Sequence, residues 1–387
     1  MKIEKLKIKN YRSFNEEQTL DFCGKESNNV TAIFGPNAGG KSNTAKALLF
    51  IKWFVINSAN PNVISPPYEP FLLNIGEDEE PSTFTLLFTH ENNRRFLYEF
   101  GIGENIIVSE KLVELSSSRK KTIFERDKNG LNATAAKFGF GKRMYENTRP
   151  GTLLITIGRV TNNEYSGIIF DFLMKTNVIT SGDPSMVNYT AQALLKNPRT
   201  KDDILNMLRE ADFCIRDFAI EESQIRKEAT ISIKTFHARR DQEQNIRDLI
   251  PFDMKDNESE GTIRFFELAS PIVDTLKNGG ILYIDEFGAH LHPDISHYIV
   301  KKFTSKKYNP QNAQLIINTH DSNLMKDMNM LGRDNIILVE KNHLEESIII
   351  PLSARAHRND EVFEKRYRQG LYGAVPMINE AAEYEYK

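Results

Sequence analysis

A phosphate-binding loop at residues 35–42 constrains this chain more than any other feature of its sequence. The loop reads Gly35-Pro36-Asn37-Ala38-Gly39-Gly40-Lys41-Ser42 and fits the pattern G-x-x-x-x-G-K-[ST]. In this pattern the glycines let backbone N–H groups surround a polyphosphate, the lysine reaches its β- and γ-phosphates, and the hydroxyl ligates Mg²⁺. The sequence therefore predicts that this loop, together with Asn43, binds ATP and Mg²⁺. The alternative is a Gly-rich turn that binds nothing.

The residues on either side of the loop favour the binding interpretation. Residues 30–34 (Val-Thr-Ala-Ile-Phe) form a short apolar run typical of a buried parallel strand. Residues 43–57 contain neither Gly nor Pro and predict a helix. The loop is thus expected between the end of a strand and the N-terminus of a helix, where the helix dipole favours an anion.

Composition narrows the class of protein. With 387 residues and a net charge of −3, the chain is long enough for two or three lobes and is not basic enough to coat nucleic acid by bulk charge. Two cysteines, Cys23 and Cys214, cannot form a disulfide framework and fit a reducing compartment. No run approaches 18 apolar residues, so we expect a cytoplasmic protein without membrane contact.

The order of the predicted elements indicates an α/β protein. Strand patterns fill much of residues 1–34, a loop follows at 58–82, and successive strands at about 83–127 suggest an antiparallel meander. Residues 150–215 look helical, residues 228–236 return to a strand, and residues 262–350 alternate helix with strand. No sustained heptad pattern predicts a coiled-coil arm.

Two later strands end in residues suited to phosphate chemistry. The apolar run 281–284 leads into Asp285 and Glu286, so Asp285 would hold Mg²⁺ while Glu286 orients or deprotonates the attacking water. A second apolar strand at 314–317 ends in Asn318-Thr319-His320, and His320 would hydrogen-bond the γ-phosphate. An acidic turn and a satisfied loop histidine are the alternatives. His290 and His292 form a His-x-His pair, which is insufficient for a zinc site without a third ligand nearby.

A short segment before a predicted helix completes the candidate residues. Ser259 can cap the helix that follows, and Gly261 leaves backbone amides open to a ligand. Taken alone, the segment is an ordinary helix cap. We call Ser259, Glu260, Gly261 and Thr262 the signature segment.

The series of motifs resembles that of ABC-type ATPases of the RecF/SMC/Rad50 class. The turn at residues 11–14 (Tyr-Arg-Ser-Phe), the loop, the signature segment, the acidic strand end with Leu291-His292-Pro293, and Asn318-Thr319-His320 follow one another as in that class. The whole chain, including its ending at residues 363–376, is similar to AAA-annotated ATPases of bacterial abortive-infection and anti-phage systems, the AbiL/RloA-like group. The resemblance implies an ABC-ATPase head with a mixed central sheet, an antiparallel β-lobe and a small helical insertion.

The resemblance also implies a mechanism and partners. Two copies would sandwich two ATP molecules, with the signature segment of each copy capping the γ-phosphate held by the other. Asp294 or its neighbours would lie at the contact between the copies, and Arg12 would approach the nucleotide phosphates. The group is usually encoded beside a nuclease-like effector, and DNA or a phage protein is a possible trigger. The signature departs from the Leu-Ser-Gly-Gly-Gln of transporters, and no Q-loop glutamine is identified.

Four segments and three functions follow as expectations. The segments are an N-terminal ATPase half at 1–149, a helical insertion at 150–227, a C-terminal ATPase half at 228–351 and a tail at 352–387. The leading function is an ATP-hydrolysing switch of an anti-phage system, acting with a separate effector. The alternatives are a RecF-like clamp on duplex DNA and a scaffold that binds ATP with little turnover.

Overall fold

The computed structural model describes most of the chain in atomic detail. The described residues are 1–24, 28–63, 67–73, 80–116, 119–131, 138, 145–180, 190–191, 194, 200–225, 228–327, 329–356 and 362–376. Parts of the predicted 150–227 segment and residues 377–387 of the predicted tail therefore lie outside these ranges. No helix in the described ranges combines the length and apolar character needed to cross a membrane.

A six-stranded mixed sheet forms the centre of the molecule, in the order β16-β15-β3-β14-β13-β9. Every pair from β15 to β9 is parallel, and only the edge strand β16 runs antiparallel to its neighbour. The strands are β3 (Val30–Phe34), β9 (Thr176–Ile179), β13 (Ile281–Phe287), β14 (Gln314–Thr319), β15 (Ile336–Lys341) and β16 (Ser347–Pro351). Since parallel strands share one carboxyl edge, the ends of β3, β13 and β14 meet at the same place.

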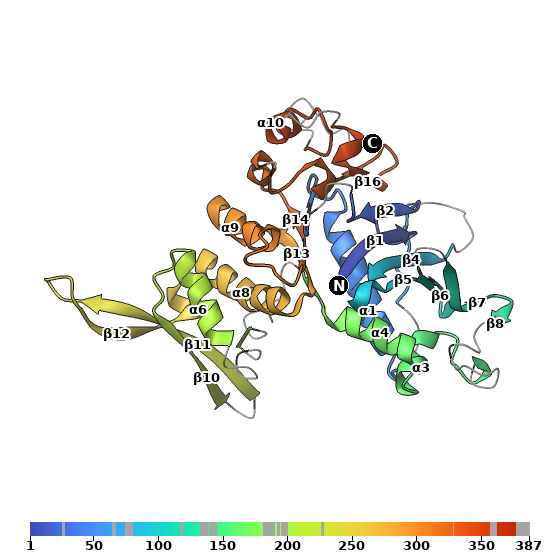
Figure 1. Cartoon of the computed structure of the whole chain (residues 1–387), viewed down its shortest axis with the longest axis horizontal. Helices are drawn as coiled ribbons and strands as arrows, with labels where there is room; N and C mark the ends of the chain where they lie inside the picture. The colour runs from blue at the N-terminus through green and yellow to red at the C-terminus, as the bar shows by residue number, and fades with distance from the viewer. Residues whose placement is uncertain are drawn as a thin grey trace, which may run out of the picture.

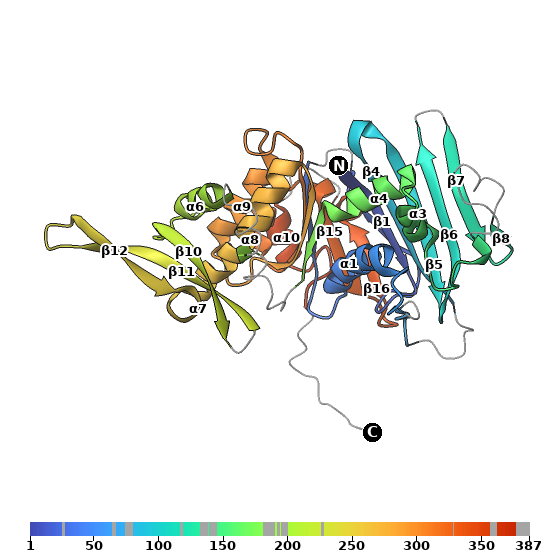
Figure 2. The ribbon, with the colours of Figure 1, turned by 90° about the horizontal axis from the view of Figure 1, so that it is seen from below.

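The two faces of this sheet are covered differently (Figures 1 and 2). Alternate residues such as Leu282 and Leu315 pack in one core with α6, α8, α9 and α10, whereas Tyr283 and Ile316 face a second core with α1, α3 and α4. The helices are α1 (Lys41–Asn57), α3 (Leu154–Val160), α4 (Glu164–Met174), α6 (Thr200–Glu210), α7 (Met254–Asn257), α8 (Glu260–Asn278), α9 (Pro293–Thr304) and α10 (Phe363–Arg368).

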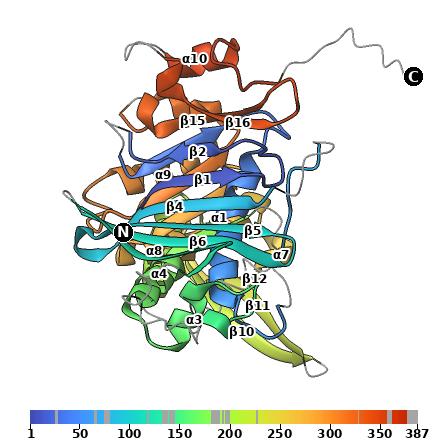
Figure 3. The same ribbon diagram turned by 90° about the vertical axis from the view of Figure 1, so that its right-hand side faces the viewer.

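A seven-stranded antiparallel sheet closes the second core, and Figure 3 looks onto it. Its order is β2-β1-β4-β5-β6-β7-β8, so the expected meander is present as β4 to β7. The strands are β1 (Lys2–Lys9), β2 (Gln18–Asp21), β4 (Ser82–Thr89), β5 (Arg95–Gly103), β6 (Ile106–Leu115), β7 (Lys120–Asp127) and β8 (Gly130–Leu131). The predicted α/β fold class with a mixed central sheet and an antiparallel β-lobe is confirmed.

The described residues between 150 and 227 include strands as well as the expected helices. Helices α3 and α4 pack between the two large sheets, and β9 pairs in parallel with β13 at the edge of the central sheet. Both helices therefore bury apolar side chains in the core shared by the two sheets. The four-part division itself stays a prediction.

A three-stranded antiparallel sheet spans the end of the 150–227 segment and the residues after it, and was not predicted as a unit. It consists of β10 (Asp217–Ile225), β11 (Glu228–Arg240) and β12 (Ile246–Asp253). Figures 1 and 2 show it projecting from the side of the molecule opposite the seven-stranded sheet. Its base joins the first core through Phe218, which meets Phe266 of α8 edge to face with ring centroids 5.1 Å apart.

Candidate nucleotide-binding site

The loop at residues 35–42 links β3 to α1, as the sequence predicts. All five residues of β3 are buried, and α1 begins at Lys41 directly after the loop. A Cβ atom at Gly35 would lie 2.0 Å from the carbonyl oxygen of Val339, so only glycine fits there. Gly40 has a φ of 113° and Ala38 a φ of 60°, which lets the backbone curl around an open space.

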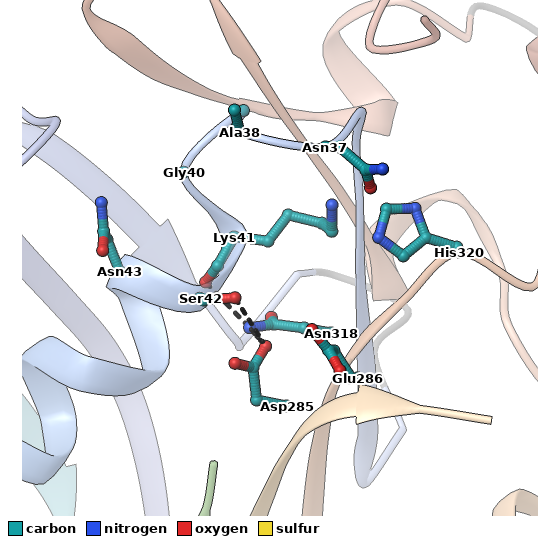
Figure 4. A pocket seen from close by; sticks show the side chains of 11 residues that line it. Asn37, Ala38, Gly40, Lys41, Ser42, Asn43, Asp285, Glu286, Asn318 and His320 are labelled. Atoms are coloured by element: carbon teal, nitrogen blue, oxygen red, sulfur yellow. Dashed lines mark hydrogen bonds between the residues drawn. The ribbon is translucent and has the colours of Figure 1, made fainter. Parts of the chain in front are cut away.

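That space is a cavity of about 390 Å³ at the carboxyl edge of the central sheet (Figure 4). It brings together three segments that are far apart in the sequence: the loop, the end of β13 and the end of β14. Its lining residues are Asn37, Ala38, Gly39, Gly40, Lys41, Ser42, Asn43, Asp285, Glu286, Asn318 and His320.

Lys41 is the buried cation of the cavity. Its side-chain Nζ donates 2.9 Å hydrogen bonds to the carbonyl oxygens of Gly35 and Pro36, and the residue is only 7% exposed. Burial lowers the pKa of the Lys41 ammonium from 10.5 to about 8, against the opposing pull of Asp285 and Glu286. A bound polyphosphate would place negative charge directly beside this ammonium, which in the free protein contacts neutral carbonyl oxygens.

Ser42 and Asp285 form the candidate Mg²⁺ site. The Ser42 Oγ lies 3.2 Å from the Asp285 Oδ1, and Figure 4 shows both side chains pointing into the same part of the cavity. A hydroxyl and a carboxylate are the oxygen donors that Mg²⁺ takes from proteins when phosphates and waters complete its shell. The two residues therefore fit this ion.

Asn318 organises the floor of the cavity, a role that sequence reasoning missed. Its Nδ2 donates at 2.8 Å to both the backbone oxygen of Lys41 and the Oδ1 of Asp285. Its Oδ1 accepts from the hydroxyl of Tyr283 at 3.0 Å, and that hydroxyl also lies 2.5 Å from the Thr44 Oγ1. The buried network thus ties the first turn of α1 to β13 and β14. The available signal was an amide side chain directly after the apolar run 315–317.

Glu286 and His320 border the open side of the cavity. Glu286 is exposed and has a φ of 53°, a left-handed conformation that directs the chain away from β13 immediately after Asp285. Burial, together with the nearby charge of Lys41, lowers the pKa of His320. The lowered pKa favours the neutral imidazole in the free protein.

The signature segment lies outside this cavity. Ser259 caps α8, and its Oγ accepts from the backbone N–H of Thr262 at 3.1 Å. Glu260 and the His290 imidazole form an exposed 2.9 Å pair, and a Cβ at Gly261 would lie 2.8 Å from the His290 oxygen. None of these residues lines the cavity of the same copy.

Arg12 is not brought into the cavity either. Its Nε lies 2.5 Å from Glu69 Oε2, and its backbone N–H donates to the Glu69 oxygen. The next residue of the turn takes the place near the loop, because Ser13 Oγ accepts from Asn43 Nδ2 at 2.8 Å. The turn therefore supports the loop through Ser13.

Two family models match this chain. Residues 5–150 match a model described as an AAA domain, and residues 162–326 match one described as "AAA domain, putative AbiEii toxin, Type IV TA system". The first match contains the loop, and the second contains Asp285, Glu286 and His320. Both segments that contribute residues to the cavity therefore match AAA-domain models.

Individual proteins resemble the chain more distantly. A stretch of 99 residues is 34% identical to one component of the nuclease SbcCD of Bacillus subtilis (strain 168), and it spans 26% of this chain but 8% of that component. The SMC head domain from Thermotoga maritima is 16% identical with a TM-score of 0.42, covering 91% of this chain and 99% of that one. The recombination mediator protein RecF bound to ATPrS is 14% identical with a TM-score of 0.41, covering 90% and 98%.

Proposed function

We propose that the protein is an ATP-hydrolysing molecular switch. The observation that carries this proposal is the convergence of the loop, Asp285, Glu286 and His320 around one cavity of about 390 Å³. A nucleotide-sized cavity lined by a phosphate loop, two carboxylates and an imidazole is suited to phosphoryl transfer to water. The AAA-domain matches support the same chemistry.

Each residue has a defined task in this proposal. The loop amides and Lys41 hold the phosphates, and Lys41 must leave the carbonyl oxygens of Gly35 and Pro36 to do so. Mg²⁺, held by Ser42 and Asp285, would neutralise charge on the phosphate oxygens. Glu286 accepts a proton from the attacking water, and the neutral His320 donates a hydrogen bond toward the γ-phosphate.

A single copy leaves the γ-phosphate side of the cavity open, so we propose that two copies close over two ATP molecules. The signature segment supports this arrangement because it sits on the N-terminus of α8, away from the cavity of its own copy. There it is free to present backbone N–H groups to the nucleotide of another copy. Closure would also exclude water other than the attacking molecule.

Mutants of the cavity test the hydrolytic part of the proposal. Phosphate release by the intact protein should fall about a hundredfold or more in Lys41→Ala and in Glu286→Gln, because each removes a group that acts on the reacting phosphate or water. The two variants should differ in binding, since Glu286→Gln keeps the whole phosphate site and Lys41→Ala does not. Unchanged phosphate release in Glu286→Gln would instead support the nucleotide-binding scaffold.

We further propose that the switch regulates an effector in anti-phage defence. This role is motivated by the resemblance to abortive-infection ATPases and by the AbiEii description of the model that matches residues 162–326. The description of that model names a toxin, and we propose that the effector is a separate protein. The anti-phage role is tested by co-expressing the adjacent gene with either the intact protein or Lys41→Ala and challenging the cells with phage. Equal protection by the intact protein and by Lys41→Ala would refute the anti-phage role.

A RecF-like clamp on duplex DNA is the second candidate, and the short stretch shared with the nuclease SbcCD favours it. A clamp should bind duplex DNA more tightly with ATP than without, with an affinity that falls steeply as salt rises. An affinity for duplex DNA that is the same with and without ATP would count against the clamp.

A further inference from the structure

The projecting three-stranded sheet is joined to the signature segment through one carboxylate. Glu258 directly precedes Ser259, and its side chain is only 9% exposed. Its Oε1 accepts from the Thr235 Oγ1 at 2.5 Å and from the His237 Nε2 at 2.7 Å. Thr235 and His237 both belong to β11, the central strand of the projecting sheet.

The sheet holds these two donors in fixed positions. Thr235 is fully buried and pairs with Phe252 of β12, while the His237 ring stacks on the Phe252 ring with centroids 4.7 Å apart. A donor that is immobilised on both sides orders its acceptor more strongly than a freely rotating one. Glu258 is therefore held at a defined point of the sheet.

The link from sheet to helix is short. After β12, Asp253 caps the single turn of α7 by accepting from the Lys255 N–H, and Met254 is buried beneath it. Glu258 follows α7, and α8 begins two residues later at Glu260. With so few residues between them, a displacement of Glu258 would move the first amides of α8.

We infer that Glu258 is a positioning residue that fixes the N-terminal end of α8 to the projecting sheet and so aligns the signature segment with the nucleotide of a second copy. This inference rests on the proposed closure of two copies over ATP. Glu258 is not among the residues that line the cavity, so it acts through the orientation of Ser259–Thr262. The sheet thereby affects the ATP-dependent contact through α8.

The test measures two binding steps in proteins that carry Glu286→Gln, so that bound ATP persists. Fluorescent-ATP titration of dilute protein reports binding to a single copy, and sedimentation with Mg²⁺ and ATP reports association of two copies. Glu258→Ala should leave the ATP affinity of a single copy unchanged and weaken the association of two copies about tenfold. This is the scale expected from losing hydrogen bonds to a charged acceptor. Glu258→Gln keeps an acceptor oxygen and should restore association to near the parent value.

Two further variants complete the design. His237→Phe keeps a ring against Phe252 but removes the hydrogen-bond donor to Glu258, so it should also weaken the association of two copies. This variant tests the inference even if Glu258→Ala does not fold. Arg239→Ala breaks an exposed pair with Asp248 on the same two strands, away from the link to α8, and serves as the matched control without effect.

Three results would overturn the inference. The first is association of Glu258→Ala at the parent affinity, the second is a loss of ATP affinity in its single copy as well, and the third is a failure of Glu258→Gln to restore association. If two copies of the parent protein do not associate in the presence of Mg²⁺ and ATP, the two-copy closure itself is refuted, and the role of Glu258 with it. This failure of the proposed function is distinguishable from a failure of the inference, because it is seen in a protein with no change at residue 258.

Discussion

Binding of ATP should be accompanied by uptake of a proton at Lys41. In the free protein burial lowers the pKa of this ammonium to about 8, and a triphosphate beside it would restore the pKa toward its ordinary 10.5. The free lysine is about 10% deprotonated at pH 7, about half at pH 8 and about 90% at pH 9, and the bound one stays charged. Uptake should therefore rise from about 0.1 to about 0.9 proton per site between pH 7 and pH 9.

The sign of the effect on affinity follows from the same linkage. Since the protonated lysine binds phosphate better, apparent affinity should be level below pH 8 and should fall about tenfold per pH unit well above it. Burial lowers the pKa of His320, so in the free protein this imidazole titrates at lower pH than Lys41 does. The measurement must therefore be made between pH 7 and pH 9.

Calorimetry with a non-hydrolysable ATP analogue and Mg²⁺, in two buffers of different ionisation enthalpy, counts the protons directly. Lys41→Arg is the matched control, because arginine keeps the positive charge but stays protonated throughout this range. Uptake that is the same at pH 7 and pH 9, or that persists in Lys41→Arg, would refute the assignment to a buried Lys41.

Three other substitutions have defined outcomes. Gly35→Ala places a Cβ atom 2.0 Å from a backbone oxygen, so it should abolish ATP binding in a titration, whereas retained affinity would contradict the tight strand-to-loop junction. Asn318→Ala removes three buried hydrogen bonds and should lower the free energy of unfolding by about 2–4 kcal/mol in urea. Glu110 is fully buried, pairs with Arg126 at 2.8 Å and accepts from two N–H groups at the start of α3, so Glu110→Ala should cost about 3–5 kcal/mol in the same assay. A loss below about 1 kcal/mol in either would contradict its buried network.

The residues that line the cavity belong to short local patterns that can be recognised in the sequence. The loop pattern, the carboxylates after residues 281–284 and His320 after another apolar run all lie at strand ends. Parallel strands bring such ends to one edge of the sheet. Only the partners inside the strands escaped notice, since Tyr283 reads as one more apolar residue until its neighbours are known.

The strand predicted at residues 228–236 lies within β11, whereas its neighbours β10 and β12 were not predicted. Residues of β12 are mostly exposed on both faces, so they show neither the alternation nor the apolar run that identifies a strand. β9 was predicted as helix for a different reason. Its four residues closely follow a helix and are too few to show the alternation of a strand. Both strands are defined by pairing with distant partners, which local patterns do not record.

A mixing experiment tests most directly whether the active site is shared between two copies. Lys41→Ala disables the phosphate loop and Ser259→Arg disables the signature segment, so each protein alone should hydrolyse almost no ATP. If one copy completes the other's site, an equal mixture should recover about a quarter of the intact rate, because half of the pairs are mixed and each has one complete site. A mixture as inactive as its components, or Ser259→Arg that hydrolyses at full speed alone, would contradict the account.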